Sequence, residues 1–199
     1  MAIRNLIFDV GSVLLDYRWD EMLIEERGLS KERAQEVGTA AFNDGFWDEF
    51  DAGLLSVEEL TARECKLHPL LADDITWFLN NPEHMGVFRP ALYDKIHELK
   101  EKGYGIYILS NYSEKFFKAH TSGAAFWQDV DGLVVSYEVH LLKPDIRIYE
   151  YLLNKYSLKA NESIFFDDRS ANVEGAKAAG IEAFLVTGEK MLIEKLGEF

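Results

Sequence analysis

Five short and nearly continuous apolar runs constrain the fold of this chain more than any other feature. They are residues 5–10 (NLIFDV), 105–110 (GIYILS), 132–137 (GLVVSY), 163–167 (SIFFD) and 182–186 (EAFLV). Such runs are typical of strands that are buried on both faces of a sheet. Amphipathic helical patterns occupy residues 90–102 and 145–156 between them. The alternation predicts an α/β fold built on a doubly wound parallel sheet.

Residues 17–88 interrupt this alternation. The stretches 30–43, 56–66 and 71–81 have helical patterns, and no strand-like run in the segment is as long as those of the sheet. Gly86 and Pro90 mark its far edge. We therefore expect a core of residues 1–16 and 89–199 with an inserted helical cap of residues 17–88. Ligands of open α/β sheets bind beyond the carboxyl ends of the strands, where such a cap would form a lid.

Composition limits the partners and the compartment. With 35 acidic and 21 basic residues the formal charge is −14, which opposes nucleic-acid binding. The single Cys65 excludes an intramolecular disulfide, and the N-terminus lacks the pattern of a secretory signal, so we expect a reducing cytoplasm. Neither nucleic acid nor a membrane is an expected partner, and no obligate protein partner is evident.

Polar residues follow four of the five predicted strands. They are Asp9, Ser110, Asn111, Lys143, Asp167 and Asp168. In a parallel sheet these residues lie at one edge, and carboxylates gathered there repel each other unless a divalent cation lies among them. An oxygen-ligand cluster with room for water suits Mg²⁺. A carboxylate nucleophile, Mg²⁺, a lysine and hydroxyl or amide donors suit phosphoryl transfer through an aspartyl-phosphate on Asp9.

Four segments in order resemble the motifs of the haloacid dehalogenase-like hydrolase superfamily. They are LIFDVGSVLLD (6–16), YILSNY (107–112), LLKPDIRIYEYLL (141–153) and IFFDDRSANVEGAKAAGI (164–181). The resemblance covers nearly the whole chain and implies a Rossmann-like core with a small α-helical cap. Within the superfamily the chain is most similar to the branch that includes bacterial sugar phosphatases such as α-D-glucose-1-phosphate phosphatase.

The resemblance also implies a set of metal ligands. Asp9 would bind Mg²⁺ with one carboxylate oxygen, Gly11 would offer its main-chain carbonyl, and Asp168 would supply a second carboxylate. Asp167 and Asn172 would lie beside the metal, as outer or water-mediated neighbours.

The same resemblance assigns the reacting groups. Asp9 would be the nucleophile. Ser110 and the amide of Asn111 would hold the phosphoryl oxygens, and Lys143 would bridge Asp9 and the phosphoryl group.

One position departs from the family pattern. Most phosphatases of the superfamily have a second Asp two residues after the nucleophile, which protonates the leaving group, and here that position is Gly11. The chain would therefore favour acidic leaving groups or take a proton donor from elsewhere, with Asp16, Asp51 and His68 as candidates. On this view Gly11→Asp would raise the rate with alkyl phosphates more than with aryl phosphates.

Several functions remain open from the sequence. The leading one is a Mg²⁺-dependent phosphatase for a small phosphorylated metabolite, with a sugar phosphate as the candidate. A dehalogenase is a second possibility, because dehalogenases also lack the second Asp. They work without metal, however, and the presence of Asp167 and Asp168 argues against this function. A non-catalytic phosphate-binding protein and a phosphomutase are the two remaining functions.

Two further patterns bear on packing. Small residues around Gly175 would let a helix approach the sheet closely, and Gly180 would end that helix. The aromatic residues near 42–50 and 116–127 are expected to pack in the lid and core, unless Phe46, Trp47 or Trp127 contacts the substrate.

Overall fold

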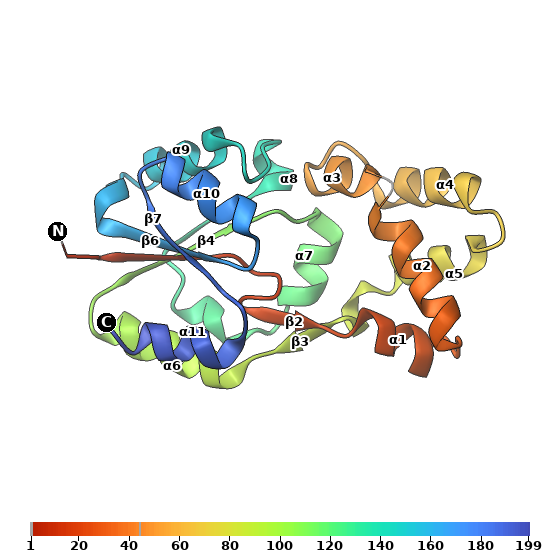
Figure 1. Cartoon of the computed structure of the whole chain (residues 1–199), viewed down its shortest axis with the longest axis horizontal. Coiled ribbons are helices and arrows are strands. Elements are labelled where there is room, and N and C mark those ends of the chain that lie inside the picture. Colours follow the sequence, from red (N-terminus) through yellow and green to blue (C-terminus); the bar gives the residue numbers. More distant parts are fainter. Residues whose placement is uncertain (1, 44) are drawn as a thin grey trace.

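The computed structural model describes residues 2–43 and 45–199, and its centre is a five-stranded parallel sheet (Figure 1). The strands are β1 (Asn5–Phe8), β4 (Gly105–Ser110), β5 (Gly132–Val135), β6 (Ser163–Asp167) and β7 (Glu182–Leu185). Their order across the sheet is β5-β4-β1-β6-β7. The five predicted strands are confirmed, with ends that are at most two residues shorter than expected.

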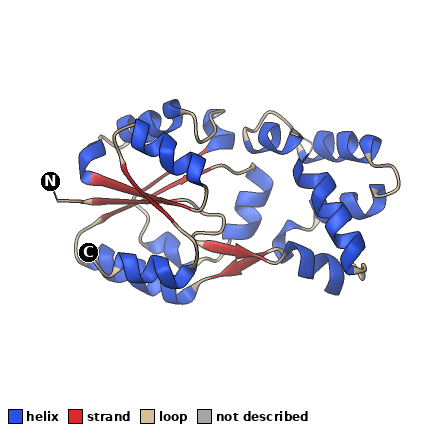
Figure 2. Cartoon of the chain, viewed as in Figure 1, coloured by secondary structure: helices blue, strands red, loops and turns tan. Residues whose placement is uncertain are grey.

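Helices cover both faces of the sheet. The helices α6 (Pro90–Glu101) and α11 (Glu189–Leu196) lie on one face, and α9 (Ile146–Lys155) and α10 (Ser170–Ala178) lie on the other (Figures 1 and 2). Shorter elements are α7 (Glu114–Thr121), α8 (Ser136–Val139) and the 3₁₀ turns η1 (Pro82–His84), η2 (Ala125–Gln128) and η3 (Ala160–Glu162). The fold is the predicted doubly wound α/β fold.

The central position of β1 follows from its side chains. Leu6 and Phe8 are buried in one hydrophobic cluster, whereas Ile7 between them is buried in a second cluster on the opposite face. A strand that is apolar on both faces is stable only where helices cover both of them. Because β1 is flanked by β4 and β6, the residue that follows it lies between the ends of two neighbouring strands.

Five helices of the segment 17–88 lie beside the sheet (Figure 1). They are α1 (Trp19–Glu25), α2 (Lys31–Asn43), α3 (Phe46–Asp51), α4 (Val57–Leu67) and α5 (Ala72–Asn80). The sequence predicted α2, α4 and α5 but not α1 and α3, which are too short to display a helical period. In the part of the chain that the structure describes, no helix has the length and apolar character needed to cross a membrane.

A two-stranded antiparallel ribbon connects these helices to the sheet. It consists of β2 (Leu15–Tyr17) and β3 (Gly86–Phe88), which the sequence did not predict because each has only three residues. The buried Arg89 holds the ribbon to the loop after β1, because its guanidinium donates to the carbonyls of Ser12 and Val13 at 3.0 and 2.9 Å. Its other terminal nitrogen lies 3.2 Å from the carboxylate of Asp16.

Gly175 lets helix α10 approach the start of α9 closely, whereas the sequence analysis expected the close approach to be to the sheet. A Cβ atom on Gly175 would lie 2.6 Å from the carbonyl oxygen of Pro144 and 3.0 Å from the ring of Tyr149. The Tyr149 hydroxyl donates to the carbonyl of Asn172 at 2.8 Å, which ties α9 to α10. Gly180 follows the helix with φ +80°, a conformation that favours glycine at a helix end.

We expect Gly175→Ala to lower the free energy of unfolding by about 1–3 kcal/mol, because the added methyl overpacks a contact with main chain. This loss would outweigh the gain in helix propensity of about 1 kcal/mol. Urea unfolding followed by circular dichroism measures the change. Gly188→Ala is the matched control, because no atom lies within 4 Å of a Cβ there, and equal stability losses in the two variants would contradict the packing argument.

Candidate active site

The carboxyl end of β1 delivers Asp9 into a cluster of hydrogen-bond donors. Its Oδ1 accepts a bond from the Ser110 hydroxyl at 2.6 Å and one from the main-chain N–H of Val10 at 2.7 Å. The Lys143 ammonium lies 2.9 Å from the same oxygen. Because Oδ1 receives all three contacts, the described residues leave Oδ2 for a ligand.

Asp167 at the end of β6 holds the lysine in place. Its Oδ2 accepts from Lys143 Nζ at 2.7 Å, and Asn172 Nδ2 donates to its two oxygens at 3.0 and 3.1 Å. Oδ1 also accepts from the main-chain N–H of Arg169 at 2.8 Å. Both oxygens of Asp167 are thus engaged with protein donors, which suits the outer, positioning role better than direct metal binding.

The charges in this cluster are strongly coupled. Burial alone would lower the pKa of Lys143, but the carboxylates of Asp9 and Asp167 outweigh it and raise the pKa above its usual value. Burial raises the pKa of Asp9, an effect that Lys143 opposes and Asp167 strengthens. Burial also raises the pKa of Asp168, and the neighbouring Asp167 adds to that rise.

These residues fit a magnesium ion. Carboxylate oxygens of Asp9, Asp167 and Asp168 lie within 4.8 Å of one another, and one lysine compensates only part of their charge. Gly11 lines the same cavity as Asp9 and Asp168. Hard oxygen donors with space for water are the ligands that Mg²⁺ prefers.

The Asn111 side chain is bonded to the loop that carries Lys143. Its side-chain amide donates to the carbonyl of Lys143 at 3.0 Å and accepts from the main-chain N–H of the same residue at 2.8 Å. The Asn111 side chain thus holds the Lys143 loop, and the second N–H of its amide remains for a ligand in the cavity that Asn111 lines.

A cavity of about 210 Å³ lies over this cluster and brings residues of the helical insertion into the site. It is lined by Asp9, Gly11, Ser12, Tyr17, Trp47, Asp48, Asp51, Asn111, Lys143, Asp168, Arg169 and Asn172. Of the three candidate proton donors, only Asp51 is among them. Asp16 pairs with Arg89 on the ribbon, and His68 lies at the end of α4, outside this cavity.

The end of α3 is fixed to the core, which positions Asp51. The Ser136 hydroxyl donates to the main-chain carbonyl of Asp51 at 2.5 Å, and His140 Nδ1 lies 2.8 Å from the carbonyl of Ala52. Gly53 has φ +68° and lies so close to Tyr137 that a Cβ atom on Gly53 would be 2.6 Å from the carbonyl oxygen of Tyr137. Asp51 is therefore held over the site by three contacts of its own segment.

The surroundings of Asp51 favour its protonated form. Burial raises the pKa of Asp51 to about 7, and the carboxylates of Asp48 and Asp9 add to the rise. The Ser113 main-chain N–H and the Lys143 ammonium oppose it. A carboxyl that titrates near neutral pH can serve as a proton donor and then as a base.

Tyr17 occupies the space that a side chain at position 11 would need. A Cβ on Gly11 would lie 2.5 Å from the Tyr17 hydroxyl oxygen, and that hydroxyl is bonded to Tyr112 at 2.5 Å. Burial raises the pKa of Tyr17 above its usual value, so Tyr17 stays neutral. An aspartate at position 11 therefore requires Tyr17 to move, and the expected gain of Gly11→Asp with alkyl phosphates stays a prediction that carries this steric cost.

Tyr17 was not predictable as a site residue, because it lies on a three-residue strand that shows no pattern. Among the aromatic residues considered for substrate contact, Trp47 lines the cavity. Phe46 instead packs against Arg63, and the Trp127 indole donates to the carbonyl of Thr121, so neither contributes to this cavity.

A comparison with protein-family models matches residues 3–180 to "haloacid dehalogenase-like hydrolase". The chain belongs to this family. It is 26% identical over 188 residues to a sesquiterpene phosphatase of Aspergillus oryzae, covering 94% of this chain and 91% of the relative. It is 25% identical over 191 residues to a D-ribitol-5-phosphate phosphatase of Bacteroides thetaiotaomicron, covering 92% and 91%.

A solved structure of similar fold is that of a haloacid dehalogenase family enzyme from Bacteroides thetaiotaomicron, in complex with magnesium and inorganic phosphate. Its TM-score is 0.75 at 22% identity, with 94% of this chain and 96% of that chain covered. This likeness supports the α/β fold.

We expect Mg²⁺ at millimolar concentration to raise the melting temperature of this hydrolase, because the ion relieves repulsion among the three carboxylates. Asp168→Asn should remove most of the rise, since it takes away one of the three charged oxygen ligands of the cluster. Asp145→Asn is the control, because Asp145 pairs with Arg147 outside the cluster. A thermal shift that is equal in both variants would contradict the assignment.

Proposed function

We propose that this hydrolase is a Mg²⁺-dependent phosphatase that acts on a small phosphorylated compound through an aspartyl-phosphate on Asp9. The observation that supports this most is the arrangement at Asp9: Lys143 and Ser110 hold one carboxylate oxygen and leave the other for attack. An oriented nucleophile beside a fixed cation is the arrangement that phosphoryl transfer requires.

Each residue of the cluster has a distinct task in this reaction. Oδ2 of Asp9 attacks phosphorus, and the ester bond to the leaving group breaks. Lys143 neutralises charge on the phosphoryl oxygens, while Asp167 and Asn111 keep it in position. Bound Mg²⁺, held by Asp9, Asp168 and the Gly11 carbonyl, would supply further charge neutralisation. Water then attacks the aspartyl-phosphate and releases phosphate.

The names of the relatives point to two kinds of substrate. One is a sesquiterpene phosphatase and the other a D-ribitol-5-phosphate phosphatase. The second supports the sugar-phosphate candidate, and the first supports an apolar leaving group.

Phosphate release from an aryl phosphate tests the proposal, because such a leaving group departs without a proton. We expect release in Mg²⁺ and none with a chelator, and we expect Asp9→Asn to reduce it at least about 10³-fold. Glu58→Gln, on the exposed side of α4, is the control. A folded wild-type protein that binds vanadate but releases no phosphate would overturn the proposal and favour a non-catalytic phosphate-binding protein.

Asp51 is the proton donor of this proposal, in place of the missing aspartate at position 11. It lines the cavity of Asp9, it is fixed to the core through its own segment, and its pKa near 7 allows it to give a proton and take one back. Alcohols are poor leaving groups without a proton, so its effect depends on the substrate.

We expect Asp51→Asn to lower kcat/KM about 10²–10⁴-fold with alkyl phosphates and much less with aryl phosphates. Asp51 is protonated below about pH 7, so proton donation is lost as the pH rises through that value. Wild-type kcat/KM with an alkyl phosphate should therefore fall above about pH 7 relative to an aryl phosphate, and the variant should lack this fall.

Glu49→Gln is the matched control for Asp51, because Glu49 lies on the same helix and pairs with the exposed Arg63. Equal losses with both substrate types would show that Asp51 acts only in positioning the cap.

The division of the chain fits this function. We propose that residues 1–16 and 89–199 form the catalytic core and that residues 17–88 form the cap that closes the site, with the cytoplasm as the compartment.

A dehalogenase or a phosphomutase uses the same nucleophile. Chloride release would identify a dehalogenase, and phosphoryl transfer to a sugar would identify a phosphomutase.

A further inference from the structure

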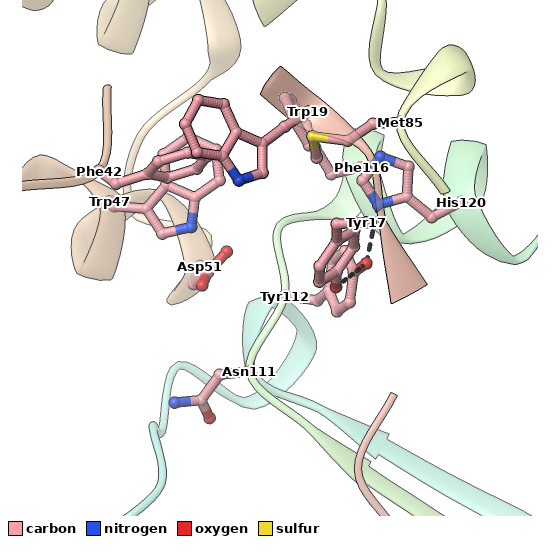
Figure 3. Close-up of a pocket in the computed structure, with 10 residues that line it drawn as sticks. All are labelled: Tyr17, Trp19, Phe42, Trp47, Asp51, Met85, Asn111, Tyr112, Phe116 and His120. Carbon is pink, nitrogen blue, oxygen red and sulfur yellow. Dashed lines mark hydrogen bonds between the residues drawn. The ribbon is translucent and has the colours of Figure 1, made fainter. Parts of the chain in front are cut away.

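A second cavity extends from the active site into the helical insertion. Its volume is about 150 Å³. The residues that line both cavities are Tyr17, Trp47, Asp51 and Asn111. Figure 3 shows Asp51 just below the Trp47 ring, the rings of Tyr17 and Tyr112 across from it, and Asn111 farther down. When the phosphoryl group of a substrate lies beside Asp9, the alcohol esterified to it lies next to this second cavity.

The walls of the second cavity are largely apolar. Its apolar lining residues are Trp19, Phe42, Trp47, Met85 and Phe116. The ring centroid of Trp47 lies 4.7 Å from that of Phe42 and 5.5 Å from that of Phe116, both edge to face, and Trp19 packs on Phe42 at 5.7 Å. These contacts fix the rings, so the cavity has a defined shape.

Most polar groups of the lining are bonded to one another. The Tyr17 hydroxyl contacts that of Tyr112, and the Tyr112 hydroxyl lies 2.7 Å from Nδ1 of His120. Asn111 is bonded to the Lys143 loop. The Asp51 carboxyl, the indole N–H groups and Nε2 of His120, which has no hydrogen-bond partner among the described residues, remain as the polar partners for a ligand. A polyol chain would lose hydration here without regaining equivalent hydrogen bonds.

We propose that the second cavity binds the apolar part of the leaving group, so that the preferred substrates are phosphomonoesters of compact apolar alcohols. The inference rests on the proposed phosphatase function. An apolar cavity of this size holds a benzene-sized group, which corresponds to an aryl ring or a branched chain of five or six carbons. Hydrolysis breaks the ester P–O bond, the alcohol leaves with a proton, and water then frees the phosphate from Asp9.

The first test compares kcat/KM for 3-methylbutyl phosphate and for glycerol 1-phosphate with the wild-type protein and Mg²⁺. We expect the alkyl ester to be preferred at least tenfold. The polyol is the more acidic leaving group, so this preference cannot arise from leaving-group chemistry. Lengthening the alkyl chain beyond six carbons should bring no further gain, because the cavity is full. Equal or faster turnover of the polyol ester would overturn the inference while leaving the phosphatase proposal intact.

A variant of Trp47 tests whether the second cavity causes the preference for alkyl over polyol esters. Trp47→Ala should reduce the alkyl-to-polyol ratio about tenfold or more and shift the optimum to longer chains, because it removes one wall. Trp77→Ala is the matched control, since it is another half-buried tryptophan of the insertion and does not line this cavity. The ratio does not depend on the fraction of folded enzyme, so partial destabilisation does not obscure the result. An unchanged ratio in Trp47→Ala would contradict the proposal.

A binding measurement separates this inference from the proposed function. Two of the four tryptophans, Trp19 and Trp47, line the cavity, so tryptophan fluorescence reports occupancy. With Mg²⁺, 3-methylbutylphosphonate should bind at least tenfold more tightly than 2,3-dihydroxypropylphosphonate. If this selectivity is found but no ester is hydrolysed, the phosphatase proposal fails and the binding site stands. If esters are hydrolysed without it, the inference fails and the phosphatase stands.

Discussion

The buried ammonium of Lys143, held between the carboxylates of Asp9 and Asp167, is the interaction that organises the site. A lysine without these partners would be costly to bury, and two carboxylates without the lysine would repel each other in the same space. The sheet order makes the triad possible, because β1 lies between β4 and β6 and brings Asp9 beside Ser110 and Asp167. The cluster still carries excess negative charge once Asp168 is included, which is why a divalent cation suits it.

The helical insertion completes this site rather than simply covering it. One hydrophobic cluster continues from Leu6 and Phe8 of the sheet to Met22 and Phe78 of the insertion, so the two parts share a core. The carbonyls of Asp51, the last residue of α3, and of Ala52 are bonded to Ser136 and His140 of the core, which places Asp51 in the cavity of Asp9. The charged residues around Asp9 therefore come from the ends of the sheet strands, and Trp47, Asp48 and Asp51 on the cavity lining come from the insertion.

The absence of an aspartate at position 11 has a structural counterpart. The Tyr17 hydroxyl fills the space that a side chain there would require, and Tyr17 also lines the apolar cavity. Asp51 and Trp47, which we propose as the proton donor and as a wall of the leaving-group site, both lie on helix α3 of the insertion.

The parallel sheet, the place of the insertion and the gathering of Asp9, Lys143, Asp167 and Asp168 at one sheet edge could all be derived from the sequence. Each of these polar groups follows a buried strand, and strand ends share one edge. A close approach at Gly175 was also predictable, but not that its partner is the α9 segment rather than the sheet. The short elements β2, β3, α1 and α3 were not, since runs of three to seven residues carry no period. The position of Asp51 in the cavity of Asp9, the bonds of Asn111 to the Lys143 loop and the place of Tyr17 emerged only in the folded chain. Those outcomes depend on contacts between segments distant in sequence, which no local pattern encodes.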